Sequence, residues 1–167
     1  MTWQTPRILT VRQPWAWAII HGGKDVENRV RNIAGNYRGP VAIHAGLTFD
    51  EPDGNDWELR RAITTQTNGW PADDGEVWSS DSIDSTDERF APRGMIIGIV
   101  GLVAVHLGSP ALGALHCSPW AEPDRWHLQL GNPLALAEPI RWQGGLGLRK
   151  CPPGLIHLID EQLKETQ

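Results

Sequence analysis

The strongest apolar run in the chain, MIIGIVGLVAVH from Met95 to His106, places the tightest constraint on what the chain can fold into. The run is rich in β-branched residues, and it is shorter than the ~18 residues that a membrane-spanning helix needs. Continuous apolar runs of this length are typical of strands that are covered on both faces. The run therefore predicts a central strand of a sheet.

Shorter patterns predict the elements around this strand. Strands are expected at 7–12, 24–30, 37–45, 124–130 and 138–142, and helices at 14–21, about 55–63 and 152–164. Gly22 and Gly23 end the first helix, and the strands at 24–30 and 37–45 could pair as a long-looped hairpin. Five or six short strands with few helices favour a small, partly open barrel or rolled sheet over alternating βαβ units.

Length and charge limit the function. A chain of 167 residues is expected to form one domain, and a net charge of -5 excludes binding to nucleic acid through a broad basic surface. No apolar run is long enough to span a membrane, so a cytoplasmic protein is expected. Cys117 and Cys151 have neither CxxC spacing nor an obvious companion set, so reduced thiols, no metal site and no cofactor are expected.

A stretch without Lys or Arg runs from Ala62 to Glu88 and is rich in Gly, Ser and Asp. Such a composition builds little core, so a flexible acidic insertion is expected at about 68–92. Trp70 and Trp78 lie inside it and could anchor a protein partner. A protein-interaction module that binds through this insertion is therefore one alternative for the function.

The polar cluster KDVENR, residues 24–29, follows the first helix directly and lies between strongly apolar segments. A lysine beside apolar surface can become a base or a nucleophile, and a nearby carboxylate such as Glu27 can share its proton. The alternative is a strand face covered with ion pairs, and strict alternation would place Asn28 opposite Asp25, Glu27 and Arg29. The two glycines would allow Lys24 to turn toward Glu27 despite this alternation.

Aromatic and amide side chains near this cluster suggest recognition of a base. Trp15 could stack on a nucleobase while the amide of Gln13 or Asn28 reads its hydrogen-bonding edge, although a tryptophan at helical spacing can equally belong to the core. His44 lies in an apolar strand, where a histidine bonded to the backbone is commoner than a catalytic one.

Three segments in this order resemble the ASCH domains of the PUA-like superfamily: TVRQPWAWAIIHGGKDVENR, YRGPVAIHA and the later WHLQLGNPLALAEPIRWQGGLGL. The resemblance implies an α+β fold, a PUA-like small β-barrel with flanking helices, as a single domain over 1–167. It also implies a nucleotide-binding cleft formed by the first helix and the GGKDVENR segment. The cleft residues would be Arg12, Gln13, Trp15, Lys24, Glu27, Asn28, Arg29, Tyr37 and His44.

The same resemblance implies a partner that is single-stranded nucleic acid, RNA above all, or a modified nucleoside. An alternative is a hydrolase, because relatives that resemble this fold include an amidohydrolase acting on acylated cytidine and a ribonuclease, both with a lysine at the place of Lys24. In the amidohydrolase pattern a threonine nucleophile lies three residues beyond that lysine, where this chain has Glu27. A carboxylate cannot replace a hydroxyl nucleophile, but Lys24 and Glu27 could together activate a water.

Overall fold

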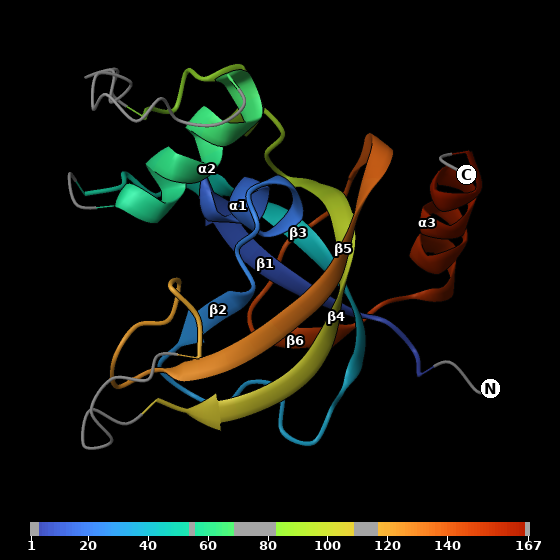
Figure 1. The fold of residues 1–167 in the computed structure, drawn as a ribbon. Helices are drawn as coiled ribbons and strands as arrows, with labels where there is room; N and C mark the ends of the chain where they lie inside the picture. The colour runs from blue at the N-terminus through green and yellow to red at the C-terminus, as the bar shows by residue number, and fades with distance from the viewer. Residues whose placement is uncertain (1–3, 54–55, 69–82, 109–116, 166–167) are drawn as a thin grey trace.

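The computed structural model of the protein describes residues 4–53, 56–68, 83–108 and 117–165. Six strands form one mixed sheet in the order β2-β5-β4-β3-β1-β6. The elements along the chain are β1 (Arg7–Gln13), α1 (Trp15–His21), β2 (Val26–Arg29), β3 (Gly39–Phe49), α2 (Trp57–Asn68), the 3-10 helix η1 (Glu88–Phe90), β4 (Met95–Leu107), β5 (Trp126–Arg141), β6 (Leu148–Lys150) and α3 (Pro153–Glu165). The apolar run at Met95 therefore forms an inner strand, as the sequence predicts (Figure 1).

The α+β class is confirmed, but the barrel that the sequence suggests is not, because the sheet ends in two edge strands, β2 and β6, that do not pair. The sheet nevertheless curves strongly, and a side chain bridges the gap that remains. Arg29 on β2 donates from Nη2 to the carbonyl oxygen of Thr10 on β1, at 2.9 Å. These two strands are separated by three others in the sheet order, so this bond links strands that backbone pairing leaves apart.

The expected hairpin between the strands at 24–30 and 37–45 is wrong. β2 pairs antiparallel with β5, whereas β3 lies between β1, to which it is parallel, and β4. The burial of β3 accounts for this difference. Val41, Ala42 and Ile43 are all at most 1% exposed, so both faces of the strand are covered by other parts of the protein. An inner position in the sheet provides this burial, whereas an edge hairpin would not. The strands expected at 124–130 and 138–142 are likewise one long strand, β5, which absorbs several register shifts against β4.

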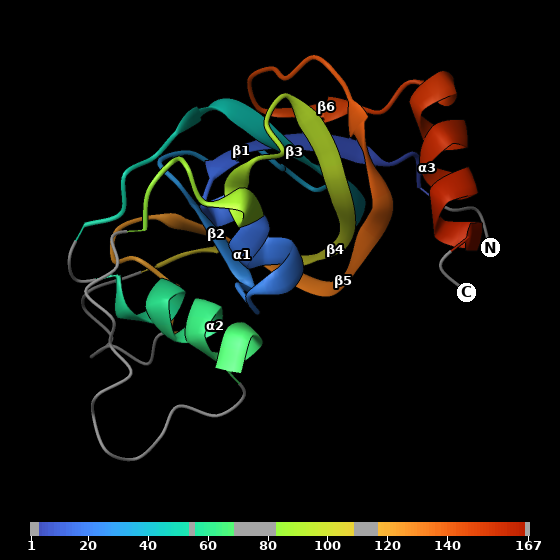
Figure 2. The same cartoon turned by 90° about the horizontal axis from the view of Figure 1, so that it is seen from above.

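Two helices cover opposite faces of the sheet. α1 lies inside the curve, where Ala16, Ile19 and Ile20 join the larger hydrophobic cluster (Figure 2). α3 packs on the outer face through Leu155 and Ile159. In the described part of the chain, none of the helices has the length and apolarity needed to cross a bilayer.

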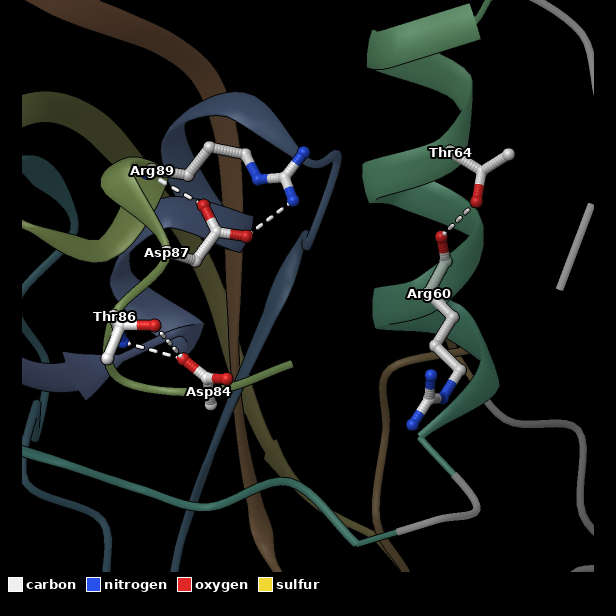
Figure 3. A network of polar contacts seen from close by, with 6 residues as sticks. All are labelled: Arg60, Thr64, Asp84, Thr86, Asp87 and Arg89. Atoms are coloured by element: carbon white, nitrogen blue, oxygen red, sulfur yellow. Dashed lines mark hydrogen bonds and ion pairs between the residues drawn. The ribbon is translucent and has the colours of Figure 1, made fainter. Parts of the chain in front are cut away.

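The expected acidic insertion at 68–92 is structured at its C-terminal end. Residues 69–82, with Trp70 and Trp78, lie outside the described residues. Beyond them, the Asp87 carboxylate accepts a bond from the backbone N–H of Arg89 at 2.9 Å and caps η1 (Figure 3). Phe90 follows at 0% exposure and packs edge-on against Trp17 of α1. Phe90 therefore ties residues 83–92 to the core, and the flexibility of the insertion stays a prediction.

Candidate functional site

The turn that ends α1 places Lys24 inside the protein. Gly22 and Lys24 both donate their backbone N–H groups to the carbonyl oxygen of Ala18, each at 2.9 Å. Gly23 between them has a φ of 74°, a left-handed conformation that glycine adopts without steric cost. This tight turn reverses the chain at once, and Lys24 is left only 5% exposed. The glycine pair therefore turns the lysine into the protein, as the sequence suggests.

The Lys24 ammonium group lies between two indole rings. Its Nζ is 5.7 Å from the centroid of the Trp15 ring and 5.5 Å from that of Trp120. Nζ also donates to the carbonyl oxygen of Val26 at 2.7 Å. Burial lowers the pKa of Lys24, while the negative charges of Glu27, Glu122 and Asp25 act in the opposite direction. The result is a desolvated lysine held among carboxylates and aromatic rings.

A pocket of about 310 Å³ opens beside Lys24. It lies between the first residue of α1, Lys24 and strand β2, the beginning of α2 and the segment 119–122 that precedes β5. Its lining residues are Trp15, Lys24, Glu27, Asn28, Asp50, Asp56, Trp57, Glu58, Leu59, Pro119, Trp120, Ala121 and Glu122. Three tryptophans and five carboxylates thus surround one lysine, a combination of flat apolar walls and polar groups that suits a small planar ligand.

Arginines outside the lining partly balance the carboxylates. The pairs are Glu27–Arg29 at 3.0 Å, Glu122–Arg125 at 3.7 Å, Asp50–Arg12 at 3.8 Å and Glu58–Arg61 at 3.9 Å. Burial raises the pKa of Asp56 and of Glu58, and the neighbouring Asp53 adds to the effect on Asp56. Glu58 keeps a buried oxygen, Oε1, without a hydrogen-bond partner among the described residues. The described lining therefore presents five carboxylates and one cation, Lys24.

Asn28 holds one wall of the pocket in place. Its Nδ2 donates to the carbonyl oxygen of Trp120 and its Oδ1 accepts from the backbone N–H of Glu122, both at 2.9 Å. Ser118 binds the same segment by donating to the Asp25 carboxylate and accepting from the Trp120 backbone N–H. The amide of Asn28 is thus bonded to backbone at both ends, so it positions the wall rather than presenting an edge to a base.

Trp57, the first residue of α2, supplies the accessible ring of the pocket. It is 55% exposed. Trp15 is less accessible, and its Nε1 donates to Asp50 Oδ2 at 3.0 Å. The backbone N–H of Asp50 in turn donates to the carbonyl oxygen of Gln13 at 2.8 Å, which fixes this carboxylate at the rim.

Four of the residues that the sequence suggests line the pocket: Trp15, Lys24, Glu27 and Asn28. Lys24 and Glu27 both line it, but no direct ion pair joins them among the described contacts, and Glu27 pairs with Arg29. Glu27 is also 8% exposed and Val26 1%, so both faces of β2 are buried at its start and the expected alternation of one wet face is wrong there.

The amide of Gln13, which the sequence offers as a reader of a base, is used inside the fold. Gln13 is 1% exposed, accepts from the Trp17 backbone N–H at 2.9 Å and donates to the carbonyl oxygen of Pro92 at 3.1 Å. Arg12 lies outside the lining and contributes only through its ion pair with Asp50. Arg29 also lies outside the lining and bridges the open side of the sheet.

Tyr37 and His44 lie away from the pocket and have structural partners. The Tyr37 hydroxyl is 2.7 Å from the carbonyl oxygen of Pro40. His44 is 1% exposed, and its Nε2 lies 2.9 Å from the carbonyl oxygen of Trp142. A carbonyl only accepts, so Nε2 carries the proton and Nδ1 accepts from the Thr10 hydroxyl at 3.3 Å. Burial lowers the pKa of His44, while its hydrogen bond to the Trp142 carbonyl acts in the opposite direction.

The pocket residues from α2 and the 119–122 segment were not identifiable from the sequence. Trp57, Glu58, Trp120 and Glu122 come from segments that contain no motif, and only the tertiary fold brings them to one pocket. The isolated Trp120 in a Pro-rich segment, SPWAEPD, is the one signal that could have indicated them.

Comparisons with known proteins place the fold but not the activity. No protein-family model matches the chain, and no curated protein matches it. Among solved structures, a mutant form of ZmASCH from Zymomonas mobilis matches with a TM-score of 0.55 over 95% of this chain and 98% of that chain, at 14% sequence identity. The chain therefore shares its overall fold with a protein of the ASCH type.

Proposed function

We propose that the protein binds a nucleobase, as a free or modified nucleoside or as the unstacked base of a single-stranded RNA, in the pocket beside Lys24. The observation that carries the proposal is the combination in that pocket of an exposed indole, Trp57, with a buried lysine and several carboxylate acceptors. Proteins that recognise unstacked bases use both kinds of group: aromatic rings stack on the face of the base, and polar groups form hydrogen bonds with its edge. The fold likeness to an ASCH protein is compatible with this role.

Trp57 is the residue best placed to stack. Its ring is 55% exposed beside the pocket, whereas Lys24 already lies over the rings of Trp15 and Trp120. A large exposed indole costs free energy in water unless a ligand covers it. A base that stacks on Trp57 gains about 1–3 kcal/mol by the usual scale of such contacts.

Lys24 and Glu27 provide a donor and an acceptor for the edge of the base. The ammonium group has three N–H donors, of which one is bonded to Val26. Glu27 uses Oε1 in its pair with Arg29 and retains a second oxygen. This set favours a base that offers an acceptor next to an amino group, as cytosine and adenine do.

The charges of the lining favour the base over the phosphate. Lys24 is the one cation among the lining residues that the structure describes, and it stands against five carboxylates. A phosphate inside the pocket would lie close to these carboxylates without an arginine fork to bind it. We therefore expect the base to enter the pocket and the sugar or the rest of the strand to remain outside.

Isothermal titration of the four ribonucleosides against wild-type protein, Trp57→Ala and Trp57→Phe tests the proposal. Trp57→Ala should weaken binding by roughly 5- to 150-fold, the equivalent of 1–3 kcal/mol, and Trp57→Phe should restore much of it. Because Trp57 is exposed, both variants should keep the wild-type melting temperature. Leu146→Ala, at a 95% exposed position outside the pocket, is the control and should bind as the wild type does. Failure of the folded wild type to bind any nucleoside at millimolar concentration would refute the proposal.

Hydrolysis is a second candidate, favoured by the buried Lys24, whose pKa burial lowers toward the range of a general base. Glu27 takes the place of a nucleophilic threonine, so water would be the nucleophile in hydrolysis of an amide on a modified pyrimidine. In the ribonuclease version, the pair would activate a ribose 2′-hydroxyl. Mass spectrometry of acylated cytidine and of RNA after incubation checks both versions. Product that Lys24→Met abolishes supports catalysis, and no product leaves binding alone.

A further inference from the structure

A second group of reactive side chains lies at the far end of the β4–β5 pair, outside the pocket lining. His106 of β4 and His127 of β5 are directly opposite in the antiparallel register. Cys117 joins them from the segment before β5, and the three potential ligand atoms all lie within 4.8 Å of one another. His127 is buried, His106 is half-buried and Cys117 is exposed. The group is therefore open to solvent on the cysteine side.

The hydrogen bonds of His127 fix which of its nitrogens faces the group. Its Nε2 is 2.6 Å from the carbonyl oxygen of Glu122, which can only accept, so Nε2 carries the proton. The bare lone pair of Nδ1 then points toward His106 Nε2 at 3.2 Å and Cys117 Sγ at 3.4 Å. Without a metal, a proton carried by His106 Nε2 or by Cys117 Sγ must point toward Nδ1 of His127. A cation can take its place.

The separations match a tetrahedral metal site. Zinc binds imidazole nitrogen at about 2.0–2.1 Å and thiolate sulfur at about 2.3 Å, so tetrahedral angles imply roughly 3.3–3.4 Å between two nitrogens and about 3.5 Å between nitrogen and sulfur. The observed separations from His127 Nδ1 are 3.2 Å and 3.4 Å. The third separation, between His106 and the exposed Cys117, is at most 4.8 Å, and a solvent-exposed side chain can adjust it without disturbing the core.

The surroundings of His127 have the features of a support for a metal ligand. Ligating histidines usually donate their second N–H to a carbonyl or carboxylate, and the carbonyl of Glu122 has this role here. Gly108 makes room for the ring, because a Cβ at this position would lie 2.5 Å from His127 Cε1. The backbone N–H of Gly108 donates to the carbonyl oxygen of Arg125 at 2.8 Å, which holds the glycine in place.

We propose that His106, Cys117 and His127 bind a Zn²⁺ ion through Nε2, Sγ and Nδ1. The thiol loses its proton to solvent on binding, and His106 takes the tautomer that carries its proton on Nδ1. Water completes the tetrahedron on the exposed side. One thiolate and two imidazoles suit zinc. The ion also fixes the segment that begins at Cys117 and ends in the wall of the pocket.

This proposal departs from the expectation of no metal site that the cysteine spacing suggests. The ligands are separated by 11 and 10 positions in the sequence and resemble no zinc motif. The register of β4 against β5 alone brings the two histidines together.

Titration of zinc into metal-free, reduced protein in competition with a chromophoric chelator tests the site. We expect one zinc per chain, with an affinity reduced at least about 100-fold in Cys117→Ser and in His106→Ala, since the loss of even an outer-shell partner typically costs 10- to 100-fold. Cys151→Ala and His157→Ala are the controls and should retain the wild-type affinity. Cys117 is exposed, so Cys117→Ser should fold normally, which a melting curve verifies.

Cobalt substitution adds a readout of the ligands themselves. Co²⁺ bound to the wild type should show the intense visible bands of a tetrahedral site and a thiolate charge-transfer band that Cys117→Ser removes. Equal zinc affinity in the wild type and Cys117→Ser would overturn the proposal, as would an octahedral cobalt spectrum in the wild type. Loss of binding in the Cys151→Ala control would also overturn it, because the ion would then lie elsewhere.

Discussion

Replacing Asn28 by alanine distinguishes a residue that positions the pocket wall from one that reads a base. Its amide joins β2 to the 119–122 segment by two hydrogen bonds of 2.9 Å, to the backbone of Trp120 and of Glu122. If Asn28 positions the wall, Asn28→Ala should destabilise the fold and lower the affinity for every nucleoside by a similar factor. A base-reading role predicts a changed order of preference among bases instead.

The magnitude follows from the two bonds. A net 0.5–1.5 kcal/mol for each gives about 1–3 kcal/mol of lost stability. For a domain of this size, 1 kcal/mol corresponds to about 2–4 °C, so the melting temperature should fall by roughly 2–12 °C. Asn28→Asp keeps the acceptor for the Glu122 N–H but cannot donate to Trp120 when ionised. We therefore expect Asn28→Asp to lose at least the stability that one of the two hydrogen bonds contributes.

Thermal unfolding with equilibrium denaturation, followed by nucleoside titration, measures both effects. Asn36→Ala, in an exposed turn, is the matched control and should change stability by no more than about 0.5 kcal/mol. An Asn28→Ala protein with wild-type stability and an altered base preference would refute the positioning role.

Two further predictions concern Lys24 and the packing of α1. Burial lowers the pKa of Lys24 below its ordinary 10.5, so between the two values the unfolded chain binds more protons than the folded one and stability rises with pH. The stability of the wild type relative to Lys24→Met should therefore increase toward pH 10.5, by at most about 1.4 kcal/mol per pH unit, and a constant difference in denaturant titrations would contradict this. Gly98→Ala would place a Cβ 2.5 Å from Ile20 Cδ1 and 2.7 Å from a backbone oxygen of β5, so we expect a loss of about 1–3 kcal/mol in the same titrations. Gly154→Ala in α3 meets nothing within 4 Å and should instead be neutral or stabilising; equal effects of the two changes would show that the contact at Gly98 is not limiting.

Local sequence signals predicted most of the elements. The apolar run at Met95, the Gly22–Gly23 end of α1 and the periodic C-terminal helix all formed where expected, because each signal acts within a few residues. β6 was missed, since three residues, Leu148–Lys150, carry too little pattern to recognise. The pairing of β2 with β5 was also missed, because it depends on which strands are buried on both faces and therefore lie inside the sheet.

The site could be predicted only where it is local. Lys24, Glu27 and Trp15 lie near one another in the sequence and share the pocket, whereas Trp57 and Trp120 arrive through tertiary packing. Gln13 shows the opposite error: its amide looks available in the sequence but is bonded inside the fold, because buried polar groups need partners. His44 is bonded to backbone, as its apolar strand favours, and only the family resemblance placed it in the cleft. The His106–Cys117–His127 group depends entirely on strand register.

The comparison of a nucleoside with its 5′-monophosphate and with a short single-stranded RNA, by calorimetric titration across a salt series, tests the central claim most directly. With five carboxylates and one lysine in the lining, the added phosphate should not improve affinity, and the RNA should bind with little dependence on salt. A monophosphate or RNA that binds at least tenfold more tightly than the nucleoside, with affinity that falls steeply as salt rises, would show that the protein grips the phosphate backbone and would contradict a pocket built for the base.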